Sequence, residues 1–423
     1  MRRMNADPDN HQQTMAAMGQ QARAAAAALA KLPAPARDAA LREAAAALRE
    51  AAPAILAANA QDMANFKGTP AFGDRLLLNE ARVEAMACGL EEVADLPDPL
   101  SRTLAQWERP NGLRIARIAQ PIGVLGMIYE SRPNVGADAA AIALKSGNAI
   151  LLRGGSESFH SAQAIHKAVT AGLKAAGLPE TAVQVAPTAD RRFVAAMLGA
   201  VGHIDLIIPR GGKTLVELVQ REARVPVLAH AQGLNHTYIH EAADPEMARS
   251  VLANAKMRRT GVCGATETLL IDAAIAPTLL PVLVADLAAL GCAFKADERA
   301  RAICPGLPAA SATDFDTEWS DAVLNVAVVD GPEAALAHVM AHGSEHTEAI
   351  ITADAQVAEA YLARSPAAVT LWNASTQFCD GGEFGFGAEI GIATGHIHAR
   401  GPIGPEQLTT FRYVVRGNGQ VRP

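Results

Sequence analysis

The sequence of 423 residues contains few cysteines, few aromatic residues and no excess of positive charge. Its five cysteines are odd in number and widely spaced, so neither a disulfide framework nor a paired-cysteine metal site is expected. A formal net charge of −7 argues against a nucleic-acid surface, because phosphate binding requires clustered basic residues. No uninterrupted apolar run approaches the roughly 18 residues of a membrane span, and the polar N-terminus has no signal-like apolar segment. We therefore expect a globular cytoplasmic protein.

The chain does contain a regular alternation of apolar runs and helix-like segments. From residue 121 onward, short strand-like runs such as 123–129 and 149–153 alternate with amphipathic or small-residue segments, and the alternation resumes over 237–373. This rhythm predicts parallel, doubly wound sheets in two α/β domains. Before it, an Ala-rich stretch over 15–65 predicts packed helices.

A hairpin is predicted around the Asn-Gly pair at 111–112, between alternating segments within 103–120. The alternating run 409–416 is a candidate partner strand. Edge strands of such an arm commonly serve oligomerisation, so we expect a homo-oligomer, a dimer or tetramer.

Cys263 is the candidate nucleophile. It is flanked by glycine and follows a short cationic stretch that contains Lys256, Arg258 and Arg259. Glycine beside a cysteine lets an electrophile approach the sulfur, and nearby positive charge favours the thiolate. The alternative is a buried structural cysteine.

No G-x-G-x-x-G segment follows a predicted strand, so a dinucleotide would need another device. Two turns between a strand and a helix combine a cation with glycines. In each turn, free backbone N–H groups and a guanidinium face the same space, where an anion could bind. The turns are Arg153-Gly154-Gly155-Ser156 and Arg210-Gly211-Gly212, the first preceded by Lys145 at the end of a predicted helix.

His338, His342 and His346 recur every four residues, which is a possible spacing for metal ligands on one helix. Gly343-Ser344 interrupts that helix, however, and no H-E-x-x-H motif is present. A helix end capped by polar residues is the better interpretation, and we expect no metal.

Six segments, in the same order along the chain, resemble the gamma-glutamyl phosphate reductase (glutamate-5-semialdehyde dehydrogenase) family of the aldehyde dehydrogenase superfamily. The resemblance covers about residues 15–417. The six segments are 129–135, 145–155, 208–212, 254–270, 329–350 and 381–402.

The resemblance implies an aldehyde dehydrogenase-like fold with a cofactor-binding domain (1–102 and 121–233), a catalytic domain carrying Cys263 (234–400) and an oligomerisation arm (103–120 and 401–423). It implies NADPH-dependent reduction of L-glutamate 5-phosphate to L-glutamate 5-semialdehyde and phosphate, the second step of proline biosynthesis. The acyl phosphate would come from a separate glutamate 5-kinase, with direct contact between the two enzymes as a hypothesis.

In this reaction Cys263 would form a thioacyl intermediate, and an oxyanion would need donors. Aldehyde dehydrogenases place an Asn after the corresponding strand; here Asn134 and Arg132 are both candidates, with Asn134 preferred. Arg132, Arg258 and Arg259 are candidates for binding the substrate's anionic groups.

The implied cofactor residues are the two turns described above together with Lys145 and Glu318, which resembles the element that holds the nicotinamide ribose. NAD-using relatives carry an acid where Ser156 stands, so a 2′-phosphate is favoured here, although Glu157 is adjacent.

Three positions depart from the patterns of relatives. Gly264 and Asn235 stand where the family usually carries Asn and often carries Cys, and neither is expected to touch the nucleophile. His230 aligns with the water-activating glutamate of hydrolytic relatives, which favours reductive chemistry.

Three alternatives remain open: another acylating NAD(P)-linked semialdehyde dehydrogenase, a metallohydrolase using the histidines at 338–346, and a non-catalytic scaffold that keeps the fold.

Overall fold

The computed structural model describes residues 8–130 and 132–422. These residues form two compact units. Unit 1 comprises the described residues up to Ala229, Gly385–Gly391 and those from Ile403 onward, and unit 2 comprises His230–Phe384 and Ile392–Pro402. The division falls four residues before the expected boundary at 233, and residues 385–391 return to unit 1.

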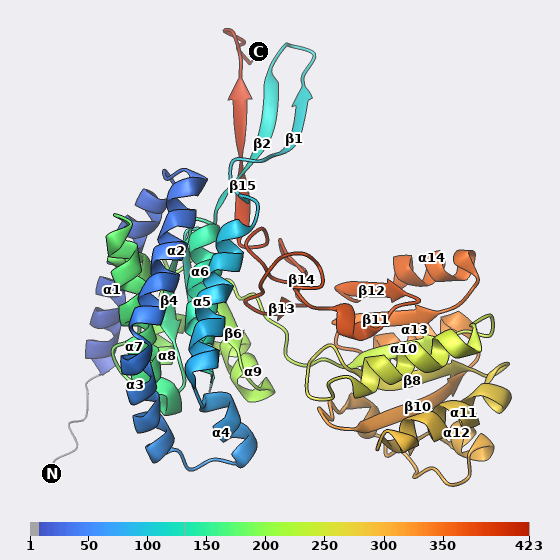
Figure 1. Cartoon of the computed structure of the whole chain (residues 1–423). Coiled ribbons are helices and arrows are strands. Elements are labelled where there is room, and N and C mark those ends of the chain that lie inside the picture. Colours follow the sequence, from blue (N-terminus) through green and yellow to red (C-terminus); the bar gives the residue numbers. More distant parts are fainter. Residues whose placement is uncertain (1–7, 131, 423) are drawn as a thin grey trace. The chain divides into compact units, whose positions relative to one another are not determined.

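Unit 1 begins with a helical layer, as the Ala-rich composition predicts (Figure 1). Prolines set the breaks: Pro33 is the N-cap of α2, and Pro53 lies in the first turn of α3. Proline suits a first helical turn because its missing N–H would have no partner there. The helices are α1 (Pro8–Leu29), α2 (Ala34–Glu50), α3 (Ala52–Asn65), α4 (Pro70–Leu76) and α5 (Glu80–Asp95).

A four-stranded parallel sheet with the order β5-β4-β3-β6 follows. Its central strand β3 (Val124–Tyr129) is buried along its whole length, which explains the unbroken apolar run in the sequence. The chain steps outward from β3 to β4 and β5 and then crosses back, so that β6 lies on the other side of β3. The carboxyl ends of β3 and β6 therefore mark the topological switch point, where open α/β sheets bind ligands.

The remaining elements of this sheet are β4 (Ala149–Arg153), β5 (Val183–Val185), β6 (Leu206–Arg210), α6 (Val135–Lys145), α7 (Phe159–Ala175), α8 (Arg192–Leu198) and α9 (Lys213–Glu222). Residues 225–229 contribute an isolated parallel bridge between Val227 and Ile207.

The predicted arm is a three-stranded antiparallel sheet of β1 (Thr103–Glu108), β2 (Arg114–Pro121) and β15 (Thr409–Arg416). Gly112 has φ +82°, a backbone conformation that glycine adopts without strain. The C-terminal strand pairs with β2 from Thr409 opposite Pro121 to Arg416 opposite Arg114, so the predicted pairing of distant segments is confirmed.

Unit 2 is built on a six-stranded parallel sheet with the order β12-β11-β7-β8-β10-β9. Leu269 and Ile271 of β8 enter one apolar cluster and Leu270 enters another, so both faces of this central strand are covered. The strands are β7 (Asn235–Ile239), β8 (Thr266–Asp272), β9 (Ala293–Ala296), β10 (Val323–Val329), β11 (Thr347–Ile351) and β12 (Val369–Trp372). The prediction of an α/β fold with parallel sheets is confirmed.

The helices of unit 2 are α10 (Pro245–Met257), α11 (Ala276–Ala289), α12 (Glu298–Ile303), α13 (Gly331–His342) and α14 (Ala355–Arg364), and a short ribbon pairs β13 (Ile392–Ala393) with β14 (Gly401–Pro402). Among the described residues, no helix is long and apolar enough to cross a membrane.

Candidate active site

Cys263 lies in unit 2, on the loop that joins the end of α10 to the start of β8. Its side chain is half-buried and packs against the small cluster of Val369, Cys379 and Ile392. A loop position beside Gly264 leaves the sulfur partly accessible, whereas a cysteine inside the buried strand β8 would be sealed in the core.

Two residues just before and at the start of β7 hold the backbone of this loop. Any side chain at Gly233 would collide with the carbonyl oxygen of Cys263. The Asn235 side-chain amide donates to the carbonyl of Cys263 at 2.6 Å and to that of Ala265 at 3.0 Å, and its oxygen accepts from the Thr347 N–H at 3.1 Å. Asn235 therefore fixes the carbonyl of Cys263, and the expectation that this position does not touch the candidate nucleophile is wrong.

Gly264 faces backbone rather than open space. A Cβ at this position would lie 3.2 Å from the carbonyl oxygen of Thr376. An Asn at position 264 would require the segment that carries Thr376 to shift. Glycine at this position therefore allows the loop to pack closely against that segment.

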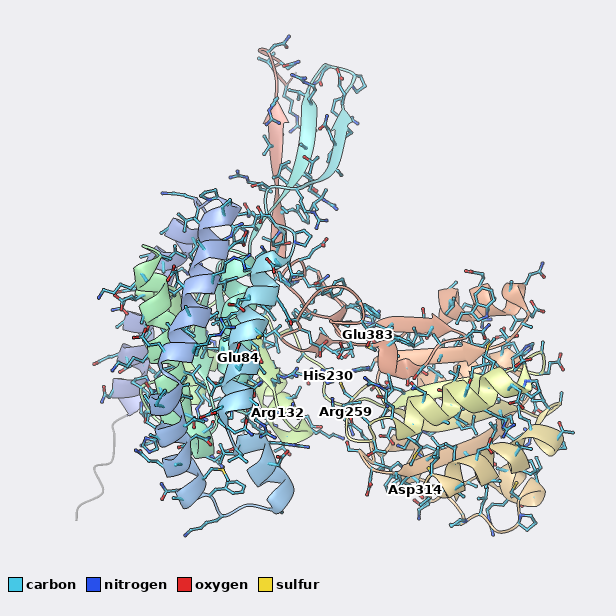
Figure 2. All side chains as sticks on the ribbon, viewed as in Figure 1. Glu84, Arg132, His230, Arg259, Asp314 and Glu383 are labelled. Carbon is cyan, nitrogen blue, oxygen red and sulfur yellow. The ribbon has the colours of Figure 1, made fainter. Side chains whose placement is uncertain are left out.

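Two imidazoles lie beside the thiol. One ring nitrogen each from His230 and His346 and the sulfur of Cys263 all lie within 4.8 Å of one another. His230 (labelled in Figure 2) has its Nδ1 at 2.7 Å from the carbonyl oxygen of Ile392, and the two rings meet edge to face at 5.1 Å between centroids. Burial, together with the nearby His230, lowers the pKa of His346 to about 3, so this imidazole is neutral at physiological pH.

The three histidines that recur every four residues are divided between two places, as the predicted interruption of the helix at Gly343-Ser344 implies. His338 and His342 lie on α13, with ring centroids 4.6 Å apart and against Phe315. His346 lies beyond the end of that helix, with Cys263 and His230. The spacing of four residues therefore does not bring the three together, and sequence reasoning missed the role of His346 as a neighbour of the thiol.

The cationic stretch before Cys263 is also divided. Lys256 is buried and donates to the Glu267 carboxylate at 2.8 Å, so its charge is used within the core and not at the thiol. Burial raises the pKa of Glu267 to about 7 against the effect of Lys256. Arg258 and Arg259 are exposed (Arg259 is labelled in Figure 2), and Arg258 contacts the side-chain oxygen of Gln377 at 3.4 Å. Within this stretch, these two arginines stay candidates for binding substrate anions.

Three of the other four thiols have raised pKa values. A hydrogen bond to the Glu84 carboxylate raises the pKa of Cys88. Burial raises the pKa of Cys292 to about 11 and also raises that of Cys304. Because a nucleophilic cysteine needs an accessible thiolate, these three sites are poor alternatives to Cys263; Cys379 is buried.

In unit 1, Asn134 immediately precedes α6, close to the carboxyl end of β3. Its side-chain amide donates to Asp138 at 3.0 Å, which fixes the orientation of the amide. Burial raises the pKa of Asp138 to about 6, while Asn134 and Arg210 act in the opposite direction. Arg132 (Figure 2) is exposed.

The turn Arg210-Gly211-Gly212 stands at the switch point, at the N-terminus of α9. The Gly212 N–H donates to the Glu130 carboxylate at 3.0 Å, and a Cβ at Gly211 would lie 2.6 Å from that same carboxylate. Arg210 contacts the Ile390 carbonyl at 3.4 Å. A carboxylate of the chain itself therefore occupies the anion position that the sequence analysis assigned to a phosphate.

The other turn, at the end of β4, carries a cluster of charges. Arg153 is buried and donates to the carbonyls of Gly154 at 2.5 Å and Ala189 at 2.9 Å, while its Nε has no partner among the described residues. Burial lowers the pKa of Arg153, the nearby Glu157 raises it and the nearby Arg191 lowers it. Ser156 contacts Glu157 at 3.2 Å. Arg191 is a residue that the sequence analysis did not single out.

Lys145 does not belong to this group. Its side chain is buried, with the ammonium 2.7 Å from Asp38 and 2.9 Å from the carbonyl of Ala94. The ion pair joins α6 to α2, so the assignment of Lys145 to the cofactor is corrected to a packing role.

Glu318 lies in unit 2, before β10, and is half-buried. It is close enough to Glu267 to add to the rise in pKa that burial causes there. Its assignment to the nicotinamide ribose stays a prediction.

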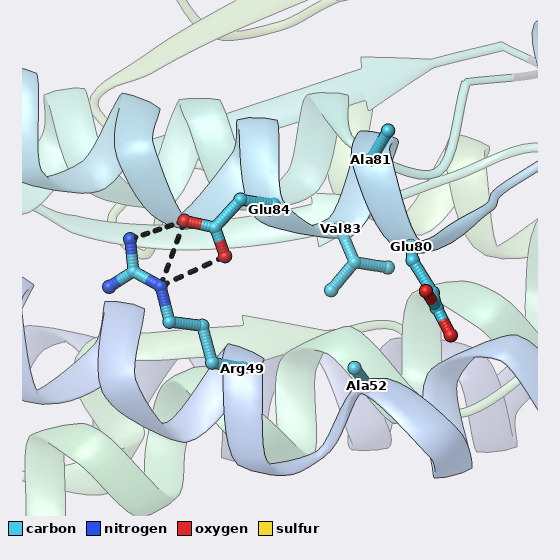
Figure 3. A pocket seen from close by; sticks show the side chains of 6 residues that line it. All are labelled: Arg49, Ala52, Glu80, Ala81, Val83 and Glu84. Atoms are coloured by element: carbon cyan, nitrogen blue, oxygen red, sulfur yellow. Dashed lines mark hydrogen bonds and ion pairs between the residues drawn. The ribbon is translucent and has the colours of Figure 1, made fainter.

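A surface pocket lies elsewhere in unit 1, where α2 and α3 meet α5 (Figure 3). Arg49 spans it and binds Glu84 at 2.8 Å. Its lining contains the ion pair but no nucleophile, so it does not rival the Cys263 site.

Comparison with known proteins places these features in a family. Residues 5–305 match the aldehyde dehydrogenase family. The chain belongs to that family, whose members are oxidoreductases with a nicotinamide cofactor.

Curated relatives narrow the assignment. The chain is 72% identical to the gamma-glutamyl phosphate reductase of Acidiphilium cryptum, over 95% of this chain and 96% of the relative, and 67% identical to that of Gluconobacter oxydans, over 96% and 95%. The crystal structure of gamma-glutamyl phosphate reductase from Thermotoga maritima superimposes with a TM-score of 0.95 at 39% identity, covering 97% of this chain and 100% of that one. Within the aldehyde dehydrogenase family, the chain therefore belongs with the gamma-glutamyl phosphate reductases, and its aldehyde dehydrogenase-like fold is confirmed.

Proposed function

We propose that this protein reduces L-glutamate 5-phosphate to L-glutamate 5-semialdehyde and phosphate, through a thioester on Cys263, in proline biosynthesis. The supporting observation is a half-exposed cysteine on a glycine-containing loop, with its peptide held by Asn235, in a chain 72% identical to a gamma-glutamyl phosphate reductase.

The covalent step uses the Cys263 thiolate. The sulfur bonds to the acyl carbon, the bond from that carbon to the phosphate oxygen breaks, and inorganic phosphate leaves with the electron pair. A reduced nicotinamide, when bound, would supply a hydride for the acyl carbon of the Cys263 thioester. The C–S bond then breaks, which releases the aldehyde and restores the thiolate.

Negative charge develops on the acyl oxygen in both steps. We assign the Cys263 backbone N–H as one donor and the Asn134 amide as the preferred side-chain donor, with Arg132 as the alternative. Asn134 is favoured because Asp138 already holds its amide in one orientation, and preorganised donors need not rearrange during reaction. Arg132, Arg258 and Arg259 are proposed to bind the carboxylate and phosphate of the substrate.

The cofactor site is proposed at the carboxyl edge of the unit 1 sheet. Gly154 and Gly155 are closely packed, since a Cβ at Gly154 would lie 3.0 Å from the Tyr129 ring and one at Gly155 would lie 2.7 Å from the Glu157 side chain. The buried Arg153 retains an Nε–H without a partner among the described residues. These features fit a pyrophosphate-linked nucleotide.

We propose NADPH as the specific cofactor. Arg153 and Arg191 carry two positive charges in this group, and Glu157 and Asp190 carry two negative ones. The supporting feature is therefore the hydroxyl of Ser156 at the position where NAD-using relatives carry an acid, which favours a 2′-phosphate. The turn Arg210-Gly211-Gly212 would bind phosphate only if the hydrogen bond from the Gly212 N–H to Glu130 were broken. Glu318 is assigned to the nicotinamide ribose.

We further propose that the protein acts in the cytoplasm as a homo-oligomer assembled through the arm. A glutamate 5-kinase must supply the labile acyl phosphate, and direct transfer between the two enzymes is the accompanying hypothesis.

The reverse reaction tests the function. Wild-type protein should reduce NADP⁺ when given glutamate 5-semialdehyde, only with phosphate present, and more efficiently than it reduces NAD⁺. Cys263→Ser should lower kcat by at least ~10³-fold, because the hydroxyl is a far weaker nucleophile without activation.

Cys304→Ser is the matched control, because Cys304 is a half-buried cysteine of the same unit. Turnover that does not depend on phosphate would point to another acylating semialdehyde dehydrogenase. Normal turnover by Cys263→Ser would refute the thioester.

A further inference from the structure

The residues around Cys263 form a set of metal ligands. The sulfur and one ring nitrogen each of His230 and His346 lie within 4.8 Å of one another, and all three belong to unit 2. One thiolate and two imidazoles are a borderline-soft donor set, which suits Zn²⁺ better than Mg²⁺ or Ca²⁺.

Outer hydrogen bonds fix the orientation of the imidazole rings. Nδ1 of His230 is 2.7 Å from the Ile392 carbonyl oxygen, which can only accept, so Nδ1 carries a hydrogen. Histidine ligands of metals generally donate their second ring N–H to a carbonyl or carboxylate in this way.

His346 adds an independent observation. Its side chain is fully buried, and its Nδ1 is 2.8 Å from the Thr347 hydroxyl. Its Nε2 is buried without a hydrogen-bond partner among the described residues. Buried polar atoms almost always have partners, so an unpartnered nitrogen beside a thiol calls for an explanation.

The geometry permits closure around an ion. Ligand atoms of tetrahedral Zn²⁺ stand about 3.5 Å apart, given Zn–S and Zn–N bonds of about 2.3 and 2.0 Å. The required contraction can come from rotation of the half-exposed Cys263 side chain, whereas His346 is buried immediately before β11.

We propose that His230, Cys263 and His346 bind Zn²⁺ reversibly, and that the ion blocks the nucleophile. The thiol proton is released on binding, sulfur becomes a ligand instead of a nucleophile, and water completes the coordination. Metal binding stands on the geometry alone, whereas the resulting inhibition rests on the proposed function.

Cobalt provides the probe, because Co²⁺ bound by a thiolate gives a sulfur-to-metal charge-transfer band. Metal-free full-length protein titrated with Co²⁺ should develop this band at one equivalent per chain, and Zn²⁺ should abolish it by displacement. Cys263→Ser should eliminate the band. His346→Gln and His230→Gln should each weaken Zn²⁺ binding at least ~10-fold, measured by calorimetry.

His342→Gln and Cys304→Ser are the controls, since both residues lie in unit 2 outside the cluster. They should bind Co²⁺ as wild type does. Circular dichroism establishes that each variant is folded. Because there are two histidine variants, the test still has a result if one of them misfolds.

Absence of the band in wild type, or an unchanged band in Cys263→Ser, would overturn the proposal. Zn²⁺ should inhibit the reverse reaction at the concentration at which it binds, and EDTA should restore activity. The two proposals fail separately: a protein that shows the band without glutamate semialdehyde turnover refutes only the proposed function, and one that turns over without the band refutes only the metal site.

Discussion

At the scale of single residues, burial decides what each polar side chain does. Lys145 and Lys256 have the same charge as Arg258, but both are buried in ion pairs, with Asp38 and Glu267. A buried cation must be paired, because an unpaired charge in the interior is costly. Their charges therefore serve packing, whereas the exposed Arg258 and Arg259 stay candidates for binding ligands.

Asp138 gives a prediction about pH. Its pKa is raised from 3.8 to about 6 by burial, so between these values the folded state keeps a proton that the unfolded state has lost. The free energy of unfolding therefore falls as pH rises through this window, and it levels off above about pH 6. Asp138→Asn should remove the effect.

The measurement is urea unfolding of wild type and Asp138→Asn at pH 5.0 and 7.5. Between these two pH values, wild type should lose about 1 kcal/mol relative to the variant. Parallel pH profiles for the two proteins would show that Asp138 titrates normally.

At the scale of elements, the loop that carries Cys263 is held by two segments that are distant in the sequence. Asn235 at the start of β7 binds the carbonyl of Cys263, and the Gln377 side chain donates to the carbonyls of Ala255 and Arg259. The loop is thus clamped by its surroundings, and the sulfur is positioned without help from regular secondary structure.

Gly233→Ala tests this clamp. The new methyl group would collide with the carbonyl of Cys263, so the loop must move, and a displacement near 1 Å can cost about 10²-fold in rate. We expect kcat for the reverse reaction to fall by about this factor while the protein stays folded. Gly306→Ala, where a methyl group meets open space, should leave kcat unchanged.

At the scale of the whole molecule, the arm presents one apolar face. Phe411, Tyr413 and Val415 alternate along β15, and Trp107 of β1 meets Tyr413 edge to face at 6.1 Å. Tyr413 and Val415 are 57% and 54% exposed, which is costly for a free sheet and typical of a surface that another copy covers.

A double substitution tests the role of the arm in assembly. Tyr413→Asp with Val415→Asp should shift the oligomer toward monomer in sedimentation experiments, because charges would be buried without partners. Arg412→Asp points from the opposite face of the same strand and should leave assembly intact. A wild-type monomer would refute the proposed assembly.

Much of the architecture follows from local patterns in the sequence. The expected strand over 149–153 is β4 residue for residue, and the hairpin and its distant partner strand were predicted from alternation and an Asn-Gly turn. Periodicity reports which face of an element is apolar, and that is a local property. The nucleophile candidate also follows from local sequence, since the glycine beside Cys263 adjoins it in the chain.

Tertiary structure alone decided which side chains contact one another. His230 and His346 meet at Cys263 although 116 positions separate them in the chain, and Glu130 fills the turn where a phosphate was expected. Such contacts depend on strand order and loop paths, which arise from the packing of the whole chain and leave no periodic signal. The sequence by itself thus determined the elements and the candidate nucleophile, while the fold determined the neighbours that surround it.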